Sequence, residues 1–128
     1  MNPSTLPEAI ALAKKIDSTG LVIAPPFPFI EEVGKAVKKA ELAGQDVFWE
    51  GKGAFTGEVD ASQLASLGVK YVIVGHSERR RLGDTDEMVA KKFSAALRNG
   101  LIPILMNKAL IISGSIFIIF FALAKAFL

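Results

Sequence analysis

The sequence predicts an α/β fold with a small parallel sheet, and its pattern of apolar residues carries this prediction. Short apolar runs of strand length alternate along the chain with segments in which apolar residues recur at helical spacing. Strands that are apolar throughout are buried on both faces, which is typical of parallel strands joined by helices. The 128 residues suffice for one domain with a core of its own.

The first helix is predicted to begin after Thr5, because Thr5 and Glu8 have the spacing of a capping box in which Glu8 accepts from the Thr5 amide. Its apolar positions recur as far as Gly20, which stops the helix. Residues 21–24, Leu-Val-Ile-Ala, are predicted to form the first strand. Three prolines within residues 25–28 then prevent strand pairing and impose a rigid loop.

A second helix is predicted over residues 30–40, where apolar and charged side chains take opposite faces. The next strand is predicted at residues 46–49, Asp-Val-Phe-Trp, followed by a glycine-rich loop at 51–57. This loop lacks the spacing of dinucleotide- and phosphate-binding motifs, so composition leaves it as a structural loop or a binding or interface loop. Asp60 is a candidate N-cap for a short helix that ends near Gly68.

Residues 71–74, Tyr-Val-Ile-Val, give the clearest strand prediction, and the chain continues from them directly into Gly75. A longer helix capped by Asp84 or Thr85 is expected to end at Gly100. A further strand is predicted at residues 102–105. The sequence therefore predicts about four parallel strands with helices between them, connected by right-handed crossovers.

The chemistry of such sheets lies at the carboxyl ends of the strands, which directs attention to the loops at residues 25–29, 50–58 and 75–84. The third loop holds His76, the single histidine. Amide groups at the start of a helical turn after His76 disfavour an imidazolium ion, so we expect a neutral ring that donates a hydrogen bond. An ordinary histidine at a strand end is the alternative. Ser77 is adjacent to His76, which does not suit a serine–histidine catalytic pair.

Composition excludes several classes of function. Without cysteine, the chain has no disulfide framework, thiolate zinc site or cysteine nucleophile, and one histidine excludes a multi-histidine metal site. We expect neither a metal nor a cofactor. The net charge of +2 is too small to indicate nucleic acid as a partner, and the arginines at 79–81 have acidic neighbours, which favours a salt-bridged surface. The N-terminus shows no signal peptide, and we expect a cytoplasmic protein.

A change in composition divides the chain into residues 1–108 and residues 109–128. The second part carries Lys125 as its single charged residue, and it holds four of the nine phenylalanines. We expect an apolar helix there; its uncharged residues 109–124 would extend for about 24 Å, against about 30 Å of bilayer core. Three interpretations remain open: a helix that packs on the open sheet face, a transmembrane or membrane-surface segment, or an out-of-frame coding end without a role.

Three segments together resemble the triosephosphate isomerase family, in order and at the family's spacing. They are Ala24–Pro28 (APPFP), Gly53–Glu58 (GAFTGE) and Tyr71–Arg80 (YVIVGHSERR). The similarity runs from about Asn2 to Leu105, and the last two motifs are highly specific. The resemblance implies a partial TIM (β/α) barrel that contains the second to fifth strands of a barrel of about 250 residues.

The resemblance also implies roles for residues after the clearest strand. His76 matches the neutral histidine that polarises the substrate carbonyl in the family. Glu78 matches the glutamate that supports the family's catalytic lysine, and Ser77 belongs to the same motif.

Interface residues follow from the resemblance in the same way. Thr56 matches the tip of a loop that inserts into the partner subunit of the family's dimer. Glu58 and Arg79 match charged residues that brace this interface. The implied partner is a second copy of the chain, and the two open edges of a four-stranded partial barrel also favour a homo-oligomer.

The family's reaction interconverts dihydroxyacetone phosphate and glyceraldehyde 3-phosphate in glycolysis and gluconeogenesis, so the implied substrate is a triose phosphate. The family's Asn-x-Lys strand, glutamate base, closing lid and phosphate-gripping loops have no counterpart in these 128 residues. We therefore expect little or no activity from the chain alone. The alternative is a non-catalytic interaction or membrane-associated protein that keeps the half-barrel as a scaffold.

Overall fold

The computed structural model describes residues 2–106 and 117–120, and its centre is a parallel five-stranded sheet. The strands lie in the order β4-β3-β2-β1-β5, and each neighbouring pair is parallel. Their bounds are β1 Leu21–Ala24, β2 Glu41–Gly44, β3 Tyr71–Val74, β4 Ile102–Leu105 and β5 Phe117–Phe120. From β1 to β4, sequence order and spatial order coincide, as in consecutive βα units.

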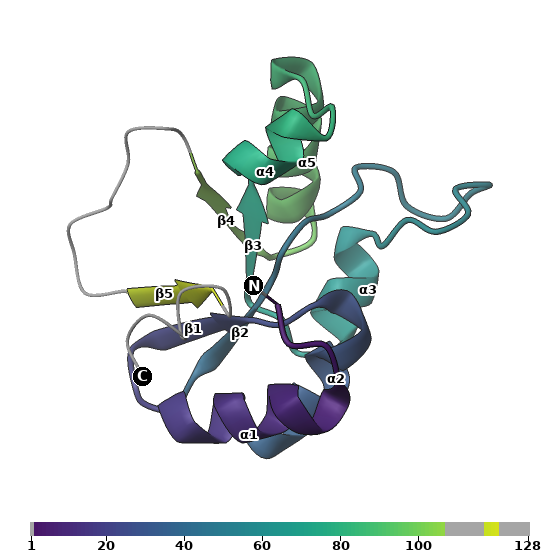
Figure 1. The fold of residues 1–128 in the computed structure, drawn as a ribbon. Coiled ribbons are helices and arrows are strands. Elements are labelled where there is room, and N and C mark those ends of the chain that lie inside the picture. Colours follow the sequence, from purple (N-terminus) through teal and green to yellow (C-terminus); the bar gives the residue numbers. More distant parts are fainter. Residues whose placement is uncertain (1, 107–116, 121–128) are drawn as a thin grey trace.

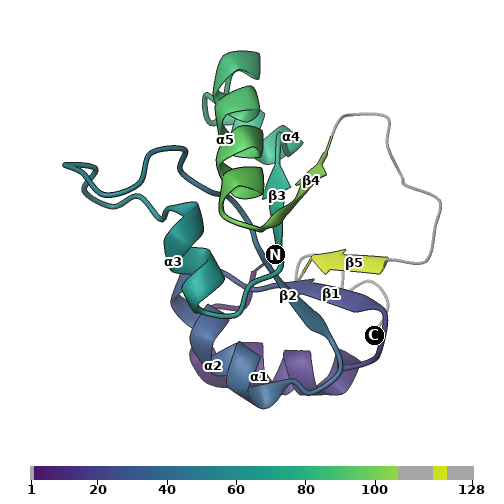
Figure 2. The same cartoon turned by 180° about the vertical axis from the view of Figure 1, so that it is seen from behind.

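The helices α1, α2, α3 and α5 lie on one side of the curved sheet, as Figures 1 and 2 show. The helical elements are α1 Leu6–Ile16, the 3₁₀ helix η1 Phe27–Phe29, α2 Ile30–Ala36, α3 Ala61–Ser66, α4 Ser77–Arg81 and α5 Asp86–Arg98. Four parallel strands alternating with helices confirm the predicted α/β architecture of a partial TIM barrel.

Side chains that alternate along each strand divide the core into two apolar clusters. The first, which we call the helix-side cluster, joins strand residues such as Ile23 and Val72 to apolar residues of the helices. The second, which we call the inner-face cluster, contains Val22, Ala24, Ala43, Tyr71, Ile73 and Ile104, with Met106 packed against it. Both faces of the sheet are therefore apolar, as a parallel sheet requires.

Helix caps agree with the sequence predictions except in one detail of α1. Thr5 Oγ1 accepts a hydrogen bond from the Glu8 amide at 3.4 Å, as predicted. The Glu8 carboxylate, however, accepts from the Ser4 amide at 2.9 Å rather than from the predicted Thr5 amide. Thr85, one of the two predicted caps, is the N-cap of α5, and its hydroxyl accepts from Met88 N at 3.2 Å.

The strand predicted at residues 46–49 is wrong. The observed strand β2 ends at Gly44, and the predicted segment contributes one isolated bridge, between Phe48 and Asp60. The second helix, predicted as far as residue 40, ends at Ala36 and leaves the following residues free to enter the sheet. The residues of β2 lie between two apolar strands, so pairing with both neighbours overrides their weak strand propensity.

The apolar helix predicted for residues 109–128 is wrong where the structure describes that segment. Residues 117–120 form β5, which pairs with β1 from Leu21↔Phe117 to Ala24↔Phe120. The sequence Phe-Ile-Ile-Phe is rich in aromatic and β-branched residues, and the edge of β1 offers unpaired backbone groups. The other residues of the predicted helix lie outside the described part of the chain.

Within residues 2–106 and 117–120, no helix has the length and apolar character needed to cross a membrane. The membrane interpretation of residues 109–128 concerns a segment that lies mostly outside these described residues.

Candidate functional site

The turn that follows β3 depends on a glycine. Gly75 has φ +77°, a left-handed conformation that other L-residues rarely adopt. A Cβ atom on Gly75 would also lie 3.3 Å from each of three atoms, on Leu105, Met106 and Val89. The glycine therefore lets the chain turn sharply against β4 and α5, and it brings the next residue, His76, to the carboxyl end of the sheet.

His76 is the N-cap of α4, and its ring nitrogen Nδ1 accepts a hydrogen bond from Glu78 N at 3.2 Å. A nitrogen that accepts a hydrogen bond carries a lone pair, so the tautomer that fits this geometry has its proton on Nε2. The side chain of His76 is 22% exposed. This geometry fits a neutral ring with its proton on Nε2, and the role of His76 as a hydrogen-bond donor stays a prediction.

The other two predicted catalytic residues follow His76 in the first turn of α4. Ser77 is the first residue of this helix, and the carboxylate Oε2 of Glu78 lies 3.8 Å from His76 Nδ1. The Glu78 side chain is 72% exposed. The structure therefore places these three residues together at the carboxyl end of β3.

Arg80 fixes the turn that carries His76. Its Nε donates to the carbonyl oxygen of Gly75 at 3.1 Å, and its Nη1 donates to Asp86 Oδ1 at 2.6 Å. Because Asp86 is the first residue of α5, the guanidinium connects the strand end to the next helix.

Behind α4 lies a buried charge cluster, which we define as Asp46, Arg79, Asp84 and Lys92. Lys92 Nζ donates to Asp84 Oδ2 at 2.6 Å and to Asp46 Oδ1 at 2.8 Å. Arg79 Nη2 donates to Asp84 Oδ1 at 3.5 Å. Arg79 Nε lies 3.1 Å from Asp46 Oδ2, a charge contact without hydrogen-bond geometry. Two cations and two carboxylates thus join α4 and α5 to the segment that follows β2.

Sequence reasoning missed this cluster, although one signal was present. Lys92 lies three residues after Val89 and four before Ala96, so it shares the buried face of an amphipathic helix. A charged residue at such a position indicates a buried partner. The sequence predicts Asp84 as a helix cap or as an acidic neighbour of the arginines at 79–81, and it predicts Asp46 in a strand. The pair of Arg79 with Asp84 agrees with this expectation, whereas the contacts of Lys92 were not expected.

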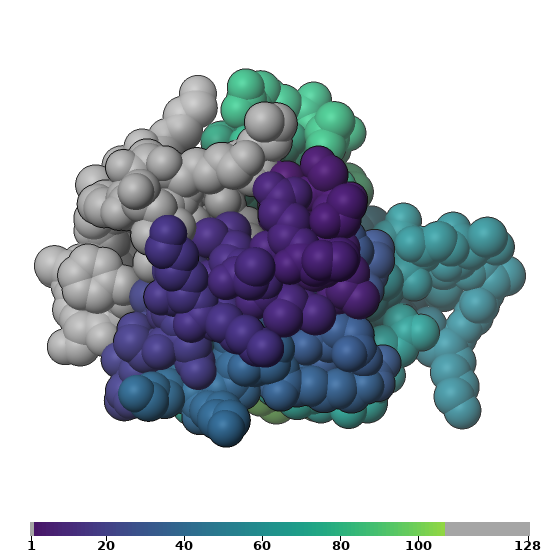
Figure 3. All heavy atoms as spheres, turned by 60° about the horizontal axis from the view of Figure 1, so that its bottom comes forward, coloured from purple at the N-terminus to yellow at the C-terminus, as the bar shows by residue number. Residues whose placement is uncertain are grey.

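The predicted interface residues Thr56 and Glu58 are exposed on the segment between β2 and α3. This segment stands out from the rest of the described chain in Figures 1 and 3. A turn in which Glu58 N donates to Phe55 O at 3.1 Å shapes its tip. Inside the loop, the rings of Phe48 and Phe55 lie 4.9 Å apart, a contact that favours one shape of the projection.

Arg79, the third predicted interface residue, lies in the buried charge cluster. Its ion-pair partners among the described residues are Asp46, at the base of the projecting loop, and Asp84, between α4 and α5. The structure therefore places Thr56 and Glu58 on the loop itself and Arg79 behind it.

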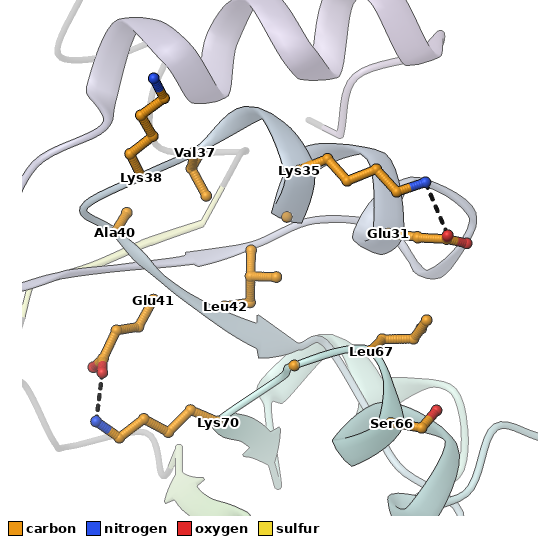
Figure 4. Close-up of a pocket in the computed structure, with 12 residues that line it drawn as sticks. Glu31, Lys35, Val37, Lys38, Ala40, Glu41, Leu42, Ser66, Leu67 and Lys70 are labelled. Atoms are coloured by element: carbon orange, nitrogen blue, oxygen red, sulfur yellow. Dashed lines mark hydrogen bonds and ion pairs between the residues drawn. The ribbon is translucent and has the colours of Figure 1, made fainter.

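A cavity of about 510 Å³ lies near the amino end of β2, between α2 and α3 (Figure 4). Its rim carries two charge pairs, Glu31–Lys35 at 2.9 Å and Glu41–Lys70. Hydrogen bonds to Glu32 and then Glu31 raise the pKa of Lys35 to about 12. Because β2 runs away from this cavity, the cavity lies at the opposite end of the sheet from His76, and no predicted site residue lines it.

Within residues 2–106 and 117–120, no group of three or more histidine, aspartate and glutamate side chains is arranged to hold a metal ion.

Comparison with known proteins identifies the family. The triosephosphate isomerase family model matches residues 4–107. The triosephosphate isomerase of Thermoanaerobacter sp. (strain X514) is 52% identical over 87 residues, which cover 66% of this chain and 35% of that protein. The triosephosphate isomerase of Citrifermentans bemidjiense is 46% identical over 100 residues, which cover 76% of this chain and 40% of that protein.

A third relative, the triosephosphate isomerase of Thiobacillus denitrificans, is 49% identical over 98 residues, or 74% of this chain and 40% of that protein. The chain thus spans about two-fifths or less of the length of these three relatives. The family match covers both the turn that carries His76 and the projecting loop. The chain therefore belongs to the triosephosphate isomerase family.

Proposed function

We propose that this chain carries the carbonyl-polarising part of a triosephosphate isomerase site, with His76 as the electrophile. The observation that supports this role is the hydrogen bond from Glu78 N to His76 Nδ1. It fits a ring with its proton on Nε2, the atom from which the proposed electrophile would donate to a developing oxyanion. Glu78 and Ser77 support this site from the first turn of α4.

The proposed substrate is a triose phosphate, and the proposed setting is glycolysis in the cytoplasm. Isomerisation requires a base that removes a carbon-bound proton, an electrophile for the enediolate, and a grip on the phosphate. Residues 4–107 match the family, and by the resemblance they include the part that supplies the electrophile. General-base catalysis contributes about 10²–10⁴-fold, and phosphate binding supports the reacting centre. We therefore propose that the chain alone has little or no isomerase activity.

The proposal includes association of two copies through the projecting loop, with Thr56 at its tip and Glu58 and Arg79 bracing it. This loop is exposed and already shaped by its own aromatic contact, which suits insertion into a partner.

The role of His76 is tested first by nuclear magnetic resonance. Because His76 is the single histidine, a ¹⁵N-labelled chain gives one pair of ring-nitrogen signals without further assignment. We expect a lone-pair shift at Nδ1 and a protonated Nε2. A ring with its proton on Nδ1 contradicts the proposed role.

Activity is tested on the purified chain from an isomerase-deleted host, with His76→Ala prepared in parallel. We expect turnover at the level of the variant. Turnover that depends on His76 contradicts the proposed inactivity and indicates that the missing groups come from elsewhere. Turnover that persists unchanged in His76→Ala contradicts the role of His76 itself.

A further inference from the structure

A groove between α2 and α3 holds two neighbouring hollows. The first, which we call the lysine hollow, is the cavity of about 510 Å³ near the amino end of β2 (Figure 4). The second, which we call the apolar hollow, has a volume of about 320 Å³ and is lined by residues of η1, α2, α3 and the segment before α3. Ser66 and Leu67 line both hollows, so the two hollows meet at the end of α3. Their volumes are typical of sites for small molecules, and their lining residues lie within residues 27–70, which the structure describes.

The apolar hollow has apolar walls. Phe27, Ile30, Val59 and Leu64 line it together with Leu67. Leu67 is 38% exposed and belongs to neither the helix-side cluster nor the inner-face cluster. Burial of such exposed apolar surface is favourable, because it removes that surface from water. The apolar hollow therefore suits a hydrocarbon group that covers Leu67.

Leu42 gives the lysine hollow an apolar floor, and two glycines leave the hollow open. In Figure 4 the Leu42 side chain lies between α2 and α3. Gly34 lies inside α2, where glycine is unfavourable, but a Cβ atom there would lie 2.9 Å from Leu42 Cδ1. A Cβ atom on Gly68 would extend into open space, since it would meet no atom within 4 Å. A hydrocarbon chain therefore meets apolar surface in both hollows.

The lysine hollow also carries charged residues at its rim. They are Glu31, Lys35, Lys38, Glu41 and Lys70. Ion pairs join Lys35 to Glu31 and Lys70 to Glu41. Within residues 2–106 and 117–120, the Lys38 ammonium group has no ion pair or hydrogen bond. Figure 4 shows this group at the rim, directed away from Leu42, so the flexible side chain can turn towards a ligand without breaking a contact. The lysine hollow therefore has one uncompensated positive charge.

The two hollows also differ in the sign of their uncompensated charge, because Glu58 lines the apolar hollow. Opposite charges attract and like charges repel, so an anionic group is favoured near Lys38 and disfavoured near Glu58. We propose that the groove binds a free single-chain carboxylate of the fatty-acid class, with its carboxylate at Lys38 and its hydrocarbon chain across Leu67 into the apolar hollow. This site goes beyond the proposed function, because it requires neither His76 nor a triose phosphate.

Sodium octanoate, kept below its micelle concentration, tests the proposal on the ¹⁵N-labelled full chain by nuclear magnetic resonance. We expect saturable changes in the amide signals of Leu42, Leu67 and Gly68, with a Kd of about 1–10 mM for a ligand of this size. Octyltrimethylammonium has the same hydrocarbon chain length and the opposite charge, and we expect it to bind at least tenfold more weakly. Equal binding of the two probes, or no saturable change with octanoate, would overturn the proposal.

The apolar contact is tested at Leu67. We expect Leu67→Asp to weaken octanoate binding at least tenfold, because it replaces the apolar surface shared by the two hollows with a negative charge. Leu97→Asp is the matched control, since Leu97 is a 56% exposed leucine of α5 that lines neither hollow, and it should leave binding unchanged. The amide spectra also show whether each variant is folded. Octanoate binding that survives in folded Leu67→Asp lies elsewhere on the chain and contradicts the proposal.

The charge contact is tested at Lys38, whose exposed side chain can be replaced without disturbing the fold. We expect Lys38→Gln to weaken octanoate binding about fivefold, as for the loss of one exposed ion pair. Lys39→Gln is the matched control, because Lys39 is the next residue, is also exposed and lines neither hollow. Its effect should be less than about twofold. Equal effects of the two substitutions would show that Lys38 does not hold the carboxylate, which overturns the proposed site.

Discussion

Lys92 shows how a single residue can hold three parts of this structure together. It lies on the buried face of α5, its side chain is 2% exposed, and it donates to both Asp46 and Asp84. An isolated buried charge is strongly unfavourable, so a lysine remains there only with partners. Arg79 completes the cluster, which balances two positive charges against two negative ones. Loss of one member leaves one charge of the cluster without a compensating charge.

We expect Lys92→Met to lower the free energy of unfolding by about 3–5 kcal/mol, because it leaves the buried Asp84 carboxylate and the partly buried Asp46 carboxylate with Arg79 as their single cation. Urea denaturation of the variant and the parent chain measures this loss. Lys91→Met is the matched control, since Lys91 pairs with Glu87 on the surface at 2.8 Å. We expect the control to change stability by less than about 1 kcal/mol. Equal losses in the two variants would show that burial of the Lys92 charge is not the cause.

A comparison of Gly75 with Gly100 separates the cost of backbone strain from the cost of steric crowding. Both have nearly the same positive φ, +77° and +74°, but a Cβ on Gly75 meets three atoms at 3.3 Å and a Cβ on Gly100 meets none within 4 Å. We expect Gly100→Ala to lower the free energy of unfolding by about 1–2 kcal/mol, the cost of the left-handed conformation. Gly75→Ala should lose more, and the His76 ring signals should shift with it. Equal losses in urea denaturation would contradict the close approach at Gly75.

Among the elements, those with strong local signals were predictable from sequence. The strand Tyr71–Val74 is apolar throughout and is followed by a glycine, and α5 has a capping threonine and a clear apolar face. The position of His76, the proposed electrophile, was predictable for the same reason, because His76 follows the clearest strand after one glycine. The buried charge cluster could not, since its members come from three elements whose proximity depends on the tertiary fold.

The sequence did not predict the strand β2, because its residues fit the packing between neighbouring elements but have a low strand propensity. Gly44 at its end is required by space: a Cβ there would lie 2.9 Å from Leu64 Cδ1 of α3 and 3.2 Å from the carbonyl oxygen of Asp46. Glutamate, alanine and glycine are all depleted in strands. Residues 46–49 have a stronger strand composition, but they do not form a strand. Instead, the side chain of Val47 packs into the helix-side cluster. The position of β2 is set by its pairing with β1 and β3, and the residues of β2 do not by themselves predict this pairing.

At the scale of elements, Asp17 connects the end of α1 to the segment before β2. Its carboxylate accepts backbone hydrogen bonds from Lys38, Lys39 and Ala40 at 2.8 to 2.9 Å. These hydrogen bonds lower the pKa of Asp17 below its usual value, and the bond from Ala40 has the largest effect. A depressed pKa in the folded state contributes stability above the unfolded pKa of about 3.9, and this stability is lost as the pH falls through the folded pKa.

We therefore expect the free energy of unfolding to fall as the pH is lowered from about 5 towards 2, and to fall less steeply in Asp17→Asn. Urea denaturation at several pH values gives both slopes. Glu50→Gln is the control, because the structure shows no hydrogen bond or ion pair for Glu50 within its described residues. An unchanged slope in Asp17→Asn, or an equal change in the control, would show that Asp17 is not responsible.

At the scale of the whole molecule, the described residues offer two different surfaces for self-association. One is the projecting loop with Thr56 at its tip (Figure 3). The other is the edge of β4, where Ile102 is 45% exposed and the outer backbone groups have no partner strand among residues 2–106 and 117–120. In the proposed assembly, the loop gives a closed dimer, whereas an open sheet edge also permits uncontrolled pairing.

We expect the loop to form the interface, so that Thr56→Arg, which places a long charged side chain at the tip, weakens dimerisation at least tenfold, or about 1.4 kcal/mol. Ile102→Lys, which adds a charge to the edge strand, should leave dimerisation unchanged. Sedimentation velocity over a range of concentrations measures both, with far-ultraviolet circular dichroism to verify that each variant is folded. If Ile102→Lys dissociates the copies and Thr56→Arg does not, the chain assembles through its sheet edge. In that case the loop, although it keeps the family's sequence, no longer works as the family's interface.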